Sequence, residues 1–372
     1  MFANQTLNVV TVTDQTVGES HGASNQYVGS VDGQAFDARS NQTTQGSVTA
    51  DTRLNVAADS GAVTSIATTA TGNAGELNVT GGTLTGIVHQ NTGAVNISAL
   101  SHIEAPHAFG GDVDEVSQAI GNSQVVTVNA GTGGVRVVQD NIAQVTSNGG
   151  GVYGTVTGKA QFQAQTMAND TTYQGSRGSG TRLETYQTNT ATLTQAAQFT
   201  AFGQVQDGTT IASAAGNNVS AVNNGFLLDA VNNQHNSAYV RAQAETSAAS
   251  FGAVTASASG VGNSALLGDN GGEIVIDNVQ LNDGGGIEAL ASTTGGDGYD
   301  AYANATATGN SVTGYACAEC GGHLSANNTQ TNTADVGASG VTNVTGTARS
   351  VTGVSNAVGN KAAYYVSRPN GG

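Results

Sequence analysis

A Gly-Asn step recurs along the chain at a nearly constant interval. The glycines of this step are Gly72, Gly121, Gly216, Gly262, Gly309 and Gly359. Successive steps are 46 to 50 residues apart, except for one gap of 95 residues, which is twice the period. Ala168-Asn169 lies midway through that gap, and Ser24-Asn25 lies 48 residues before Gly72. The chain therefore carries eight markers of one repeating unit.

A second marker keeps the same period independently. It is a glutamine, usually followed two residues later by asparagine, at Gln42, Gln90, Gln139, Gln187, Gln234, Gln280 and Gln330. Each glutamine precedes its Gly-Asn or Ala-Asn marker by 28 to 31 residues. Two unrelated markers in step over most of a chain indicate a solenoid or a repeat array.

The units have the pattern of β-strands. Segments such as "VNISAL", "YVRAQA" and "EIVIDNVQL" alternate apolar and polar residues, which is the period of a strand with one buried face. Helical repeats would avoid the abundant glycine. Gly, Asn and Asp tolerate left-handed conformations, so we expect the Gly-Asn markers at tight corners. The predicted fold is all-β, an elongated β-solenoid (β-helix) of about eight repeats of roughly 48 residues.

The length of the unit predicts the shape of the solenoid. Forty-eight residues are long for a single coil, so we expect two or three coils per repeat. With strands about 4.8 Å apart, eight repeats of two coils would form a rod of roughly 75 Å. We assign residues 1–372 to a single repeat domain, with an N-terminal partial repeat or cap at 1–41, repeats at 42–89, 90–138, 139–186, 187–233, 234–279 and 280–329, and the last repeat with a C-terminal cap at 330–372.

Composition excludes several classes of protein. Glycine supplies 53 of the 372 residues, and such a content with few aromatics would suit a disordered chain. The abundance of Val, Thr and Ile and the low charged content of 10% argue against disorder. A net charge of −16 without a basic run argues against binding to nucleic acid. The sequence shows no transmembrane segment and no signal peptide, and it suggests no cofactor.

The marker amides have a predicted structural role. In stacked coils, equivalent Asn or Gln side chains can bond to those above and below and form ladders. The predicted ladder residues are Gln90, Gln139, Gln187, Gln234, Gln280, Gln330, Asn73, Asn122, Asn169, Asn217, Asn263, Asn310 and Asn360. They are poor candidates for catalysis.

The segment "GGDGYDAYA" at 295–303 matches one copy of the calcium-binding β-roll pattern. Asp297 and Asp300 would supply carboxylate ligands to the ion. Calcium-binding β-rolls carry the pattern in tandem, whereas this chain has a single copy. The alternative is a glycine-rich corner without a metal, and we favour that interpretation.

Two further segments hold residues that often bind metals. "CAECGGH" contains Cys317, Cys320 and His323; a local disulfide between the cysteines is expected and would indicate an oxidising compartment, with two free thiols as the alternative. The context suits neither a redox motif nor a four-ligand zinc site. "SHIEAPHAFGGDVDE" at 101–115 contains His102 and His107 and could carry a metal, although its length suggests a modified lateral face or partner contact.

Enzymatic activity is not expected. A polysaccharide-cleaving solenoid would need two carboxyl groups at a defined separation. The acidic residues here are isolated, and the repeats leave no room for long side loops.

The opening "FANQTLNVVTVTDQT", the "ATGNS"-type markers, the "QTN" phrases and the tail "VGNKAAYYVSRP" resemble the holdfast anchor protein family of stalked alphaproteobacteria, of the HfaD type. The resemblance extends over residues 2–369 and shares its repeat character with curli-like fibre subunits. It implies a cell-surface, outer-membrane-associated protein that helps to tether an adhesive polysaccharide. It also implies companion anchor proteins and export through a curli-type outer-membrane secretion channel.

The function expected from the sequence is therefore a secreted structural adhesin or anchor, which could assemble end to end because uncapped solenoids expose strand edges. Two alternatives are an amyloid-like or phage-type fibre subunit and a carbohydrate-binding or carbohydrate-cleaving β-helix.

Overall fold

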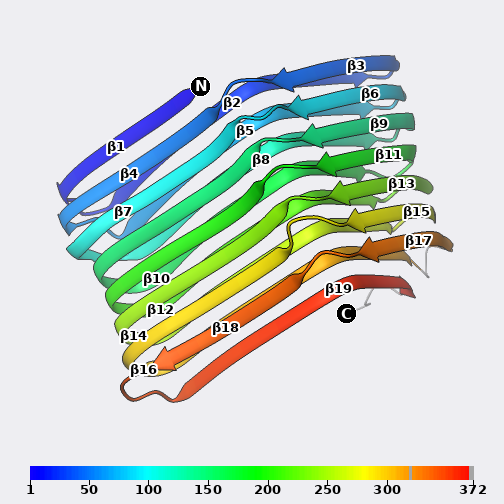
Figure 1. The fold of residues 1–372 in the computed structure, drawn as a ribbon. Helices are drawn as coiled ribbons and strands as arrows, with labels where there is room; N and C mark the ends of the chain where they lie inside the picture. Colours follow the sequence, from blue (N-terminus) through cyan, green and yellow to red (C-terminus); the bar gives the residue numbers. More distant parts are fainter. Residues whose placement is uncertain (318–320, 368–372) are drawn as a thin grey trace.

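The computed structural model describes residues 1–317 and 321–367, and these form 19 β-strands in two sheets. Neighbouring strands run parallel throughout the described residues. Successive circuits of the chain stack from the N-terminal to the C-terminal side (Figure 1). The expected all-β solenoid is thereby confirmed. The described residues include no helix that is long and apolar enough to cross a membrane.

The strands group into eight coils. The first three coils have three strands each: β1 (Phe2–Thr11), β2 (Gln15–Asp32) and β3 (Ala35–Thr44); β4 (Val48–Asp59), β5 (Val63–Thr80) and β6 (Thr83–Thr92); β7 (Asn96–Gly110), β8 (Asp112–Asn129) and β9 (Thr132–Asn141). In the next four coils the first two strands are continuous: β10 (Gln144–Gly175) and β11 (Gly180–Asn189); β12 (Leu193–Asn223) and β13 (Leu227–Asn236); β14 (Tyr239–Asp269) and β15 (Glu273–Asn282); β16 (Ile287–Cys317) and β17 (Leu324–Asn332). The eighth coil contains β18 (Val336–Val344) and β19 (Ser350–Ser367).

Each repeat forms one coil, so the expectation of two or three coils per repeat was wrong. Asn25 pairs with Asn73 on the next coil, and Asn73 pairs with Asn122 on the one after, so partners are one full repeat apart. The strands are longer than the alternating segments suggested, since β5 alone has 18 residues. Eight coils span seven strand spacings, or about 34 Å along the stack instead of roughly 75 Å.

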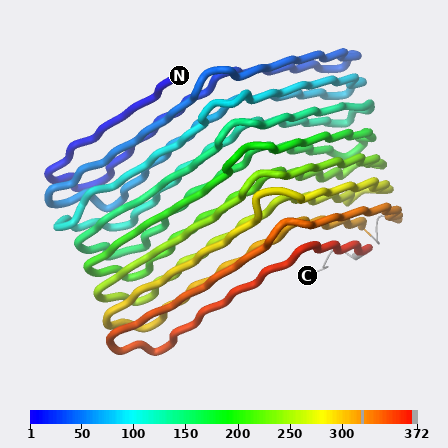
Figure 2. Tube along the Cα trace, in the orientation of Figure 1, coloured from blue at the N-terminus to red at the C-terminus, as the bar shows by residue number. Residues whose placement is uncertain are grey.

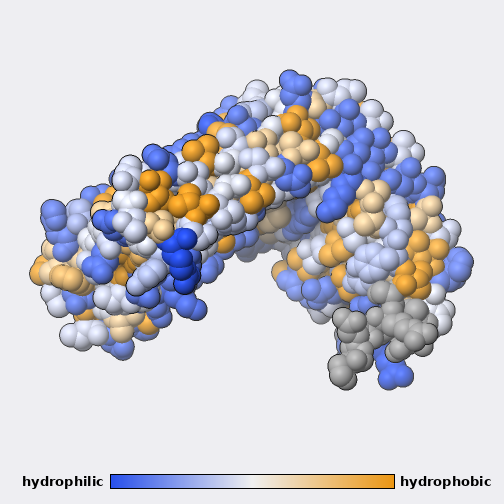
Figure 3. All heavy atoms as spheres, turned by 90° about the horizontal axis from the view of Figure 1, so that it is seen from below, coloured by the Kyte–Doolittle hydropathy of each residue, from blue (hydrophilic) through white to orange (hydrophobic). Residues whose placement is uncertain are grey.

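Each coil is flattened and bent into two arms (Figures 1 and 2). The first arm contains β4 and the first half of β5 or their equivalents, and the second arm contains the other half of β5 together with β6. Strands β3, β6, β9, β11, β13, β15 and β17 make the seven-stranded sheet of the second arm. Seen from below, the stack shows the two arms meeting at an angle (Figure 3).

The Gly-Asn markers lie at the bend between the arms, inside the strands. Along β5, alternate positions are buried on both sides of the marker, at 64, 66, 68 and 70 before it and at 73, 75, 77 and 79 after it, and positions 71 and 72 between them are also buried. The marker therefore shifts the alternation by one residue, and the strand continues in the other arm. The expectation that the Gly-Asn markers form tight corners between strands was therefore wrong. Positive φ angles occur at other glycines, such as Gly33, Gly81 and Gly178 between strands.

The arms have different cores. The second arm is filled by Leu and Val side chains such as Leu77, Leu84 and Val137. The outer end of the first arm holds aromatic residues, including Tyr153 and Phe162. Alanine fills most of the first arm near the bend, where the two layers lie close together. Between these apolar regions, the bend itself has a polar interior.

Candidate functional site

The polar interior of the bend begins with a row of glutamines. In each step along the row, the Nε2 of one glutamine donates to the Oε1 of the glutamine on the preceding coil, at 2.7–2.8 Å. The row runs through Gln42, Gln90, Gln139, Gln187, Gln234, Gln280 and Gln330. Each Nε2 also donates to a backbone carbonyl just beyond the marker on the facing strand, as Gln187 does to Asn218. The glutamines thus connect the coils and also the two layers of the second arm.

The marker asparagines form a second row that runs in the opposite direction. Each Nδ2 donates to the Oδ1 of the asparagine on the following coil at 2.8 Å. The row runs through Asn25, Asn73, Asn122, Asn169, Asn217, Asn263, Asn310 and Asn360. Most members also donate to a carbonyl of the seven-stranded sheet, as Asn217 does to His235 at 2.9 Å.

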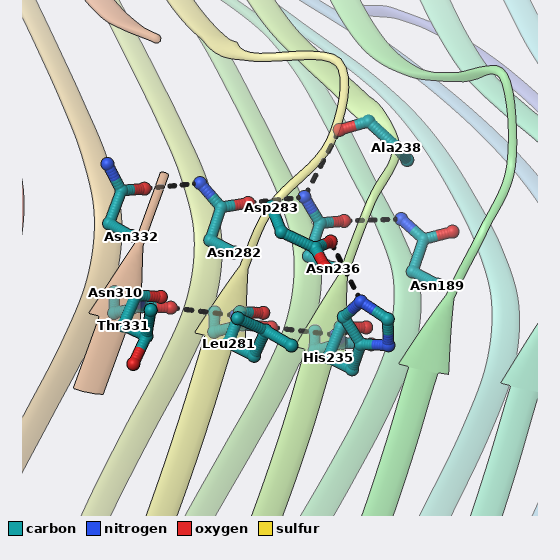
Figure 4. A network of polar contacts seen from close by, with 12 residues as sticks. Asn189, His235, Asn236, Ala238, Leu281, Asn282, Asp283, Asn310, Thr331 and Asn332 are labelled. Atoms are coloured by element: carbon teal, nitrogen blue, oxygen red, sulfur yellow. Dashed lines mark hydrogen bonds and ion pairs between the residues drawn. The ribbon is translucent and has the colours of Figure 1, made fainter. Parts of the chain in front are cut away.

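A third row consists of the asparagines two residues after the glutamines. Asn141, Asn189, Asn236, Asn282 and Asn332 bond in succession at 2.6–3.0 Å, and Figure 4 shows the last four of them side by side. On the earlier coils Thr44 and Thr92 take this place, and Thr92 donates to Asn141. This row was missed from the sequence as a set of site residues, although the Gln-x-Asn spacing was the signal for it.

These rows satisfy polar groups that would otherwise be costly to bury. Asn122, Gln139 and Asn217 are fully buried, and a buried amide without partners costs about 1–3 kcal/mol. Carboxamide side chains neither gain nor lose a proton near neutral pH, so they do not act as general acids or bases. The arrangement holds coils together and has no capacity for proton transfer.

At five of the six marker glycines, all except Gly359, a Cβ would come too close to neighbouring atoms. A Cβ at Gly309 would lie 2.2 Å from Asn332 Oδ1 and 2.4 Å from the carbonyl oxygen of Gly359. A Cβ at Gly262 would lie 2.5 Å from the carbonyl oxygen of Gly309. Ala168 is accommodated at the equivalent place on one coil, where it is fully buried. The bend is therefore a point of close approach between coils and the asparagine rows.

One carboxyl group is buried in the first arm. Glu115 is fully buried and accepts a 2.6 Å hydrogen bond from Nε2 of Gln198, two coils away. Its Oε1 has no hydrogen-bond partner among the described residues. Burial raises the pKa of Glu115 well above its usual range, and the bond from Gln198 offsets part of this effect. Gly149 lies between the two, and its missing Cβ leaves room for both side chains.

The histidine-containing segment forms a lateral wall of the solenoid. It lies mostly on β7, which pairs with β4 and β10. His102 Nε2 lies 3.1 Å from Glu104 Oε2, and both side chains are about half exposed. Pro106 and His107 lie at a register irregularity between β7 and β10. The described residues contain no group of three or more His, Cys, Asp or Glu that could hold a metal ion.

The calcium candidates Asp297 and Asp300 bond to the last coil. Asp297 Oδ1 accepts from the backbone N–H of Thr347 at 2.7 Å, and Asp300 forms an ion pair with Arg349. The Arg349 guanidinium holds the pKa of Asp300 below its usual value. Both carboxylates thus have partners within the chain, on the eighth coil.

The predicted disulfide falls at the edge of the described residues. Cys317 is buried at the end of β16. Cys320 lies outside the described residues, so the pairing of these cysteines stays a prediction.

Comparison with known protein families gives a match over most of the chain. The family model "HfaD: Holdfast attachment protein D" matches residues 10–286, which run from β1 to the end of the sixth coil. No match was found among curated proteins, and none was found among solved structures.

Proposed function

Because the chain belongs to the holdfast attachment protein D family, we propose that it is a structural anchor that tethers an adhesive polysaccharide to the outer membrane. Membership implies a role in holdfast attachment, a cell-surface location and association with the holdfast polysaccharide. It also suggests a structural role without enzymatic activity. The family match over residues 10–286 is the observation that carries the proposal.

The fold supports an anchoring role through its rigidity. Parallel pairing extends across both arms on every coil, and the amide rows tie each coil to the next. A parallel sheet covered on its inner face by a core resists local opening. Such a scaffold can hold a polymer at a fixed place on the surface. The resemblance in sequence further suggests companion anchor proteins and a curli-type secretion channel.

The test is genetic and needs a readout that separates anchoring from synthesis. Deleting the gene should release the adhesive polysaccharide into the medium while its total amount stays unchanged. Complementation with the full chain should restore attachment. Unchanged attachment of the deletion strain would refute the anchoring function.

End-to-end assembly is a second, compatible proposal. The asparagine row ends with a donor at Asn360, whose Nδ2 has only a long 3.4 Å contact to the carbonyl oxygen of Gln330. At the other end, Asn25 presents its Oδ1, which accepts no bond within the described residues. The outermost coils also expose apolar side chains, including Phe2 and Val341. A second copy stacked head to tail would join the donor to the acceptor.

Sedimentation of the purified chain over a wide concentration range tests this assembly. We expect mass to increase with concentration and to decrease in an Asn360→Lys variant, because a buried ammonium at the joint would lack a partner. A monomer at the highest concentration would refute assembly without affecting the anchoring proposal.

A further inference from the structure

A groove of about 710 Å³ lies along the outer end of the first arm. Figure 1 shows the chain turning back on itself there on successive coils. Its lining residues come from the third to the eighth coil. Between Asp112 on the third coil and Arg349 on the eighth, five strand spacings give it a length of about 24 Å. The groove therefore runs parallel to the stacking axis.

An aromatic ring forms one end of the groove. Tyr299 has an exposed fraction of 62%, which is high for a tyrosine on a strand of a folded core. The Arg349 guanidinium lies 5.8 Å from the centre of its ring, and Arg349 in turn is held by a two-point contact with Asp300. The ring is thus fixed in an exposed position, which lowers the entropy cost of stacking a ligand on it.

Polar groups without partners line the rest of the groove. Within the described part of the chain, the Lys159 ammonium, the Gln206 amide and the Asp207 carboxylate form no hydrogen bond or ion pair. Gly252 and Ala253 line the groove between these groups and Tyr299, and their small size leaves space there for a ligand. The groove thus combines an aromatic platform with polar groups that are available to a ligand.

The charges indicate what class of ligand fits. Asp112, Asp207 and Asp300 are opposed by Lys159 and Arg349, so the groove has almost balanced charge within a chain of net charge −16. A strongly anionic polymer would meet carboxylates along its length. A chain of sugar rings offers apolar faces to the tyrosine ring and many hydroxyl groups to the amide, ammonium and carboxylates.

We propose that this groove binds a stretch of several linked sugar rings of a polysaccharide that is not strongly anionic, with Tyr299 as the stacking platform. The proposal rests on the proposed anchoring function for its physiological meaning, but the binding itself can be measured independently. It also gives a role to the segment "GGDGYDAYA", which contains both Tyr299 and Asp300.

The direct test is calorimetric titration of the purified full chain with hexasaccharides of three kinds: cello-oligosaccharide, chito-oligosaccharide and oligogalacturonate. We expect measurable binding of at least one of the first two and weaker binding of the anionic third. Tyr299→Ala should weaken the binding at least tenfold, whereas Tyr299→Phe should keep most of it. Absence of binding by all three probes, or preference for oligogalacturonate, would overturn the proposal.

Phe109→Ala is the matched control, because Phe109 is an exposed aromatic residue (58%) of the first arm that does not line the groove. It should bind the probe like the unmodified chain. Equal loss of binding in both aromatic variants would overturn the assignment of the site to this groove. Unchanged thermal unfolding of Tyr299→Ala would show that its loss of binding is local.

A cellular comparison distinguishes this proposal from the anchoring function. If gene deletion releases the adhesive but Tyr299→Ala cells retain it and the purified variant binds normally, the groove proposal fails and the anchor remains. If deletion leaves attachment unchanged while the purified chain binds sugars through Tyr299, the anchoring function fails and the groove remains.

Discussion

Replacing Asn217 with alanine tests whether the amide rows stabilise the solenoid. Asn217 is fully buried on the fifth coil. It accepts from Asn169 at 2.8 Å and donates to Asn263 at 2.8 Å and to the carbonyl oxygen of His235 at 2.9 Å. Three hydrogen bonds at about 1 kcal/mol each give about 3 kcal/mol, and leaving Asn263 Oδ1 buried without this donor adds about 1–3 kcal/mol. We therefore expect a loss of about 4–6 kcal/mol in the free energy of unfolding.

The assay is urea unfolding followed by far-ultraviolet circular dichroism. Asn270→Ala is the control, because Asn270 is exposed and its side chain bonds to Asn224, at 3.0 Å, and to the partly buried Tyr315, so its effect should stay within about 1 kcal/mol. Asn217→Asp should destabilise at least as much as Asn217→Ala, because it keeps the volume but replaces the donor with a carboxylate facing Asn263 Oδ1. If Asn217→Ala lowers the free energy of unfolding by less than about 1 kcal/mol, or if Asn217→Asp does not lower it, hydrogen bonding in this row is not the source of stability.

Three other substitutions test separate contributions to the stability of the fold: the ionisation of a buried carboxyl, the packing of a glycine and an exposed ion pair. Because burial raises the pKa of Glu115, its neutral form favours folding; this contribution is complete below the pKa of the unfolded chain and is lost as pH rises through the folded-state value. Glu115→Gln should therefore flatten the decline of the unfolding midpoint over the pH range between the pKa of glutamate in the unfolded chain and the raised folded-state pKa of Glu115, whereas the half-exposed Glu104→Gln should leave this decline unchanged. Gly151→Ala should cost about 1–3 kcal/mol in urea unfolding, since its Cβ would lie 2.3 Å from the Phe162 ring, and Gly46→Ala, with open space around it, should be nearly neutral. Arg182→Ala breaks exposed ion pairs with Glu184 and Asp229 and should cost less than about 1 kcal/mol, decreasing further in high salt.

Each of these smaller predictions has an outcome that contradicts it. An unchanged pH profile for Glu115→Gln would mean that the carboxyl does not titrate in the folded chain. A neutral Gly151→Ala would mean that Phe162 can move aside. A large, salt-independent effect of Arg182→Ala would assign that side chain a packing role instead of an electrostatic one.

The fold class was predictable because nearly every unit carries the same markers and the same alternation of apolar and polar residues. Alternation defined strands, and the spacing of Gln90 and Asn73 from their equivalents defined the period. The number of coils per repeat was not predictable from alternation, because the shift of the buried face at Gly72 looks like the end of a strand. In the structure β5 continues through that shift, and one circuit of the two arms uses the whole repeat.

Features that occur once in the chain were harder to predict. The sequence placed Glu115 in an unusual segment but gave no sign that Gln198, 83 residues away, would cover it. Tyr299 and Asp300 were noticed only through a calcium-type pattern, since their relation to Arg349 depends on the stacking of the seventh coil on the eighth. The register between neighbouring coils determines these contacts, and this register cannot be read from a single sequence.

The use of a whole repeat for each coil has a mechanical consequence. A fully extended segment of 48 residues would reach about 160 Å, yet here it adds only about 4.8 Å along the stack. In exchange, a pull along the stacking axis is shared by all the hydrogen bonds between two coils, including those across the long pairing of β12 with β14. A pull on one edge would instead open these bonds one after another. The force that the stack withstands therefore depends on how the load is applied, and it is greatest when the load is spread evenly over a whole coil.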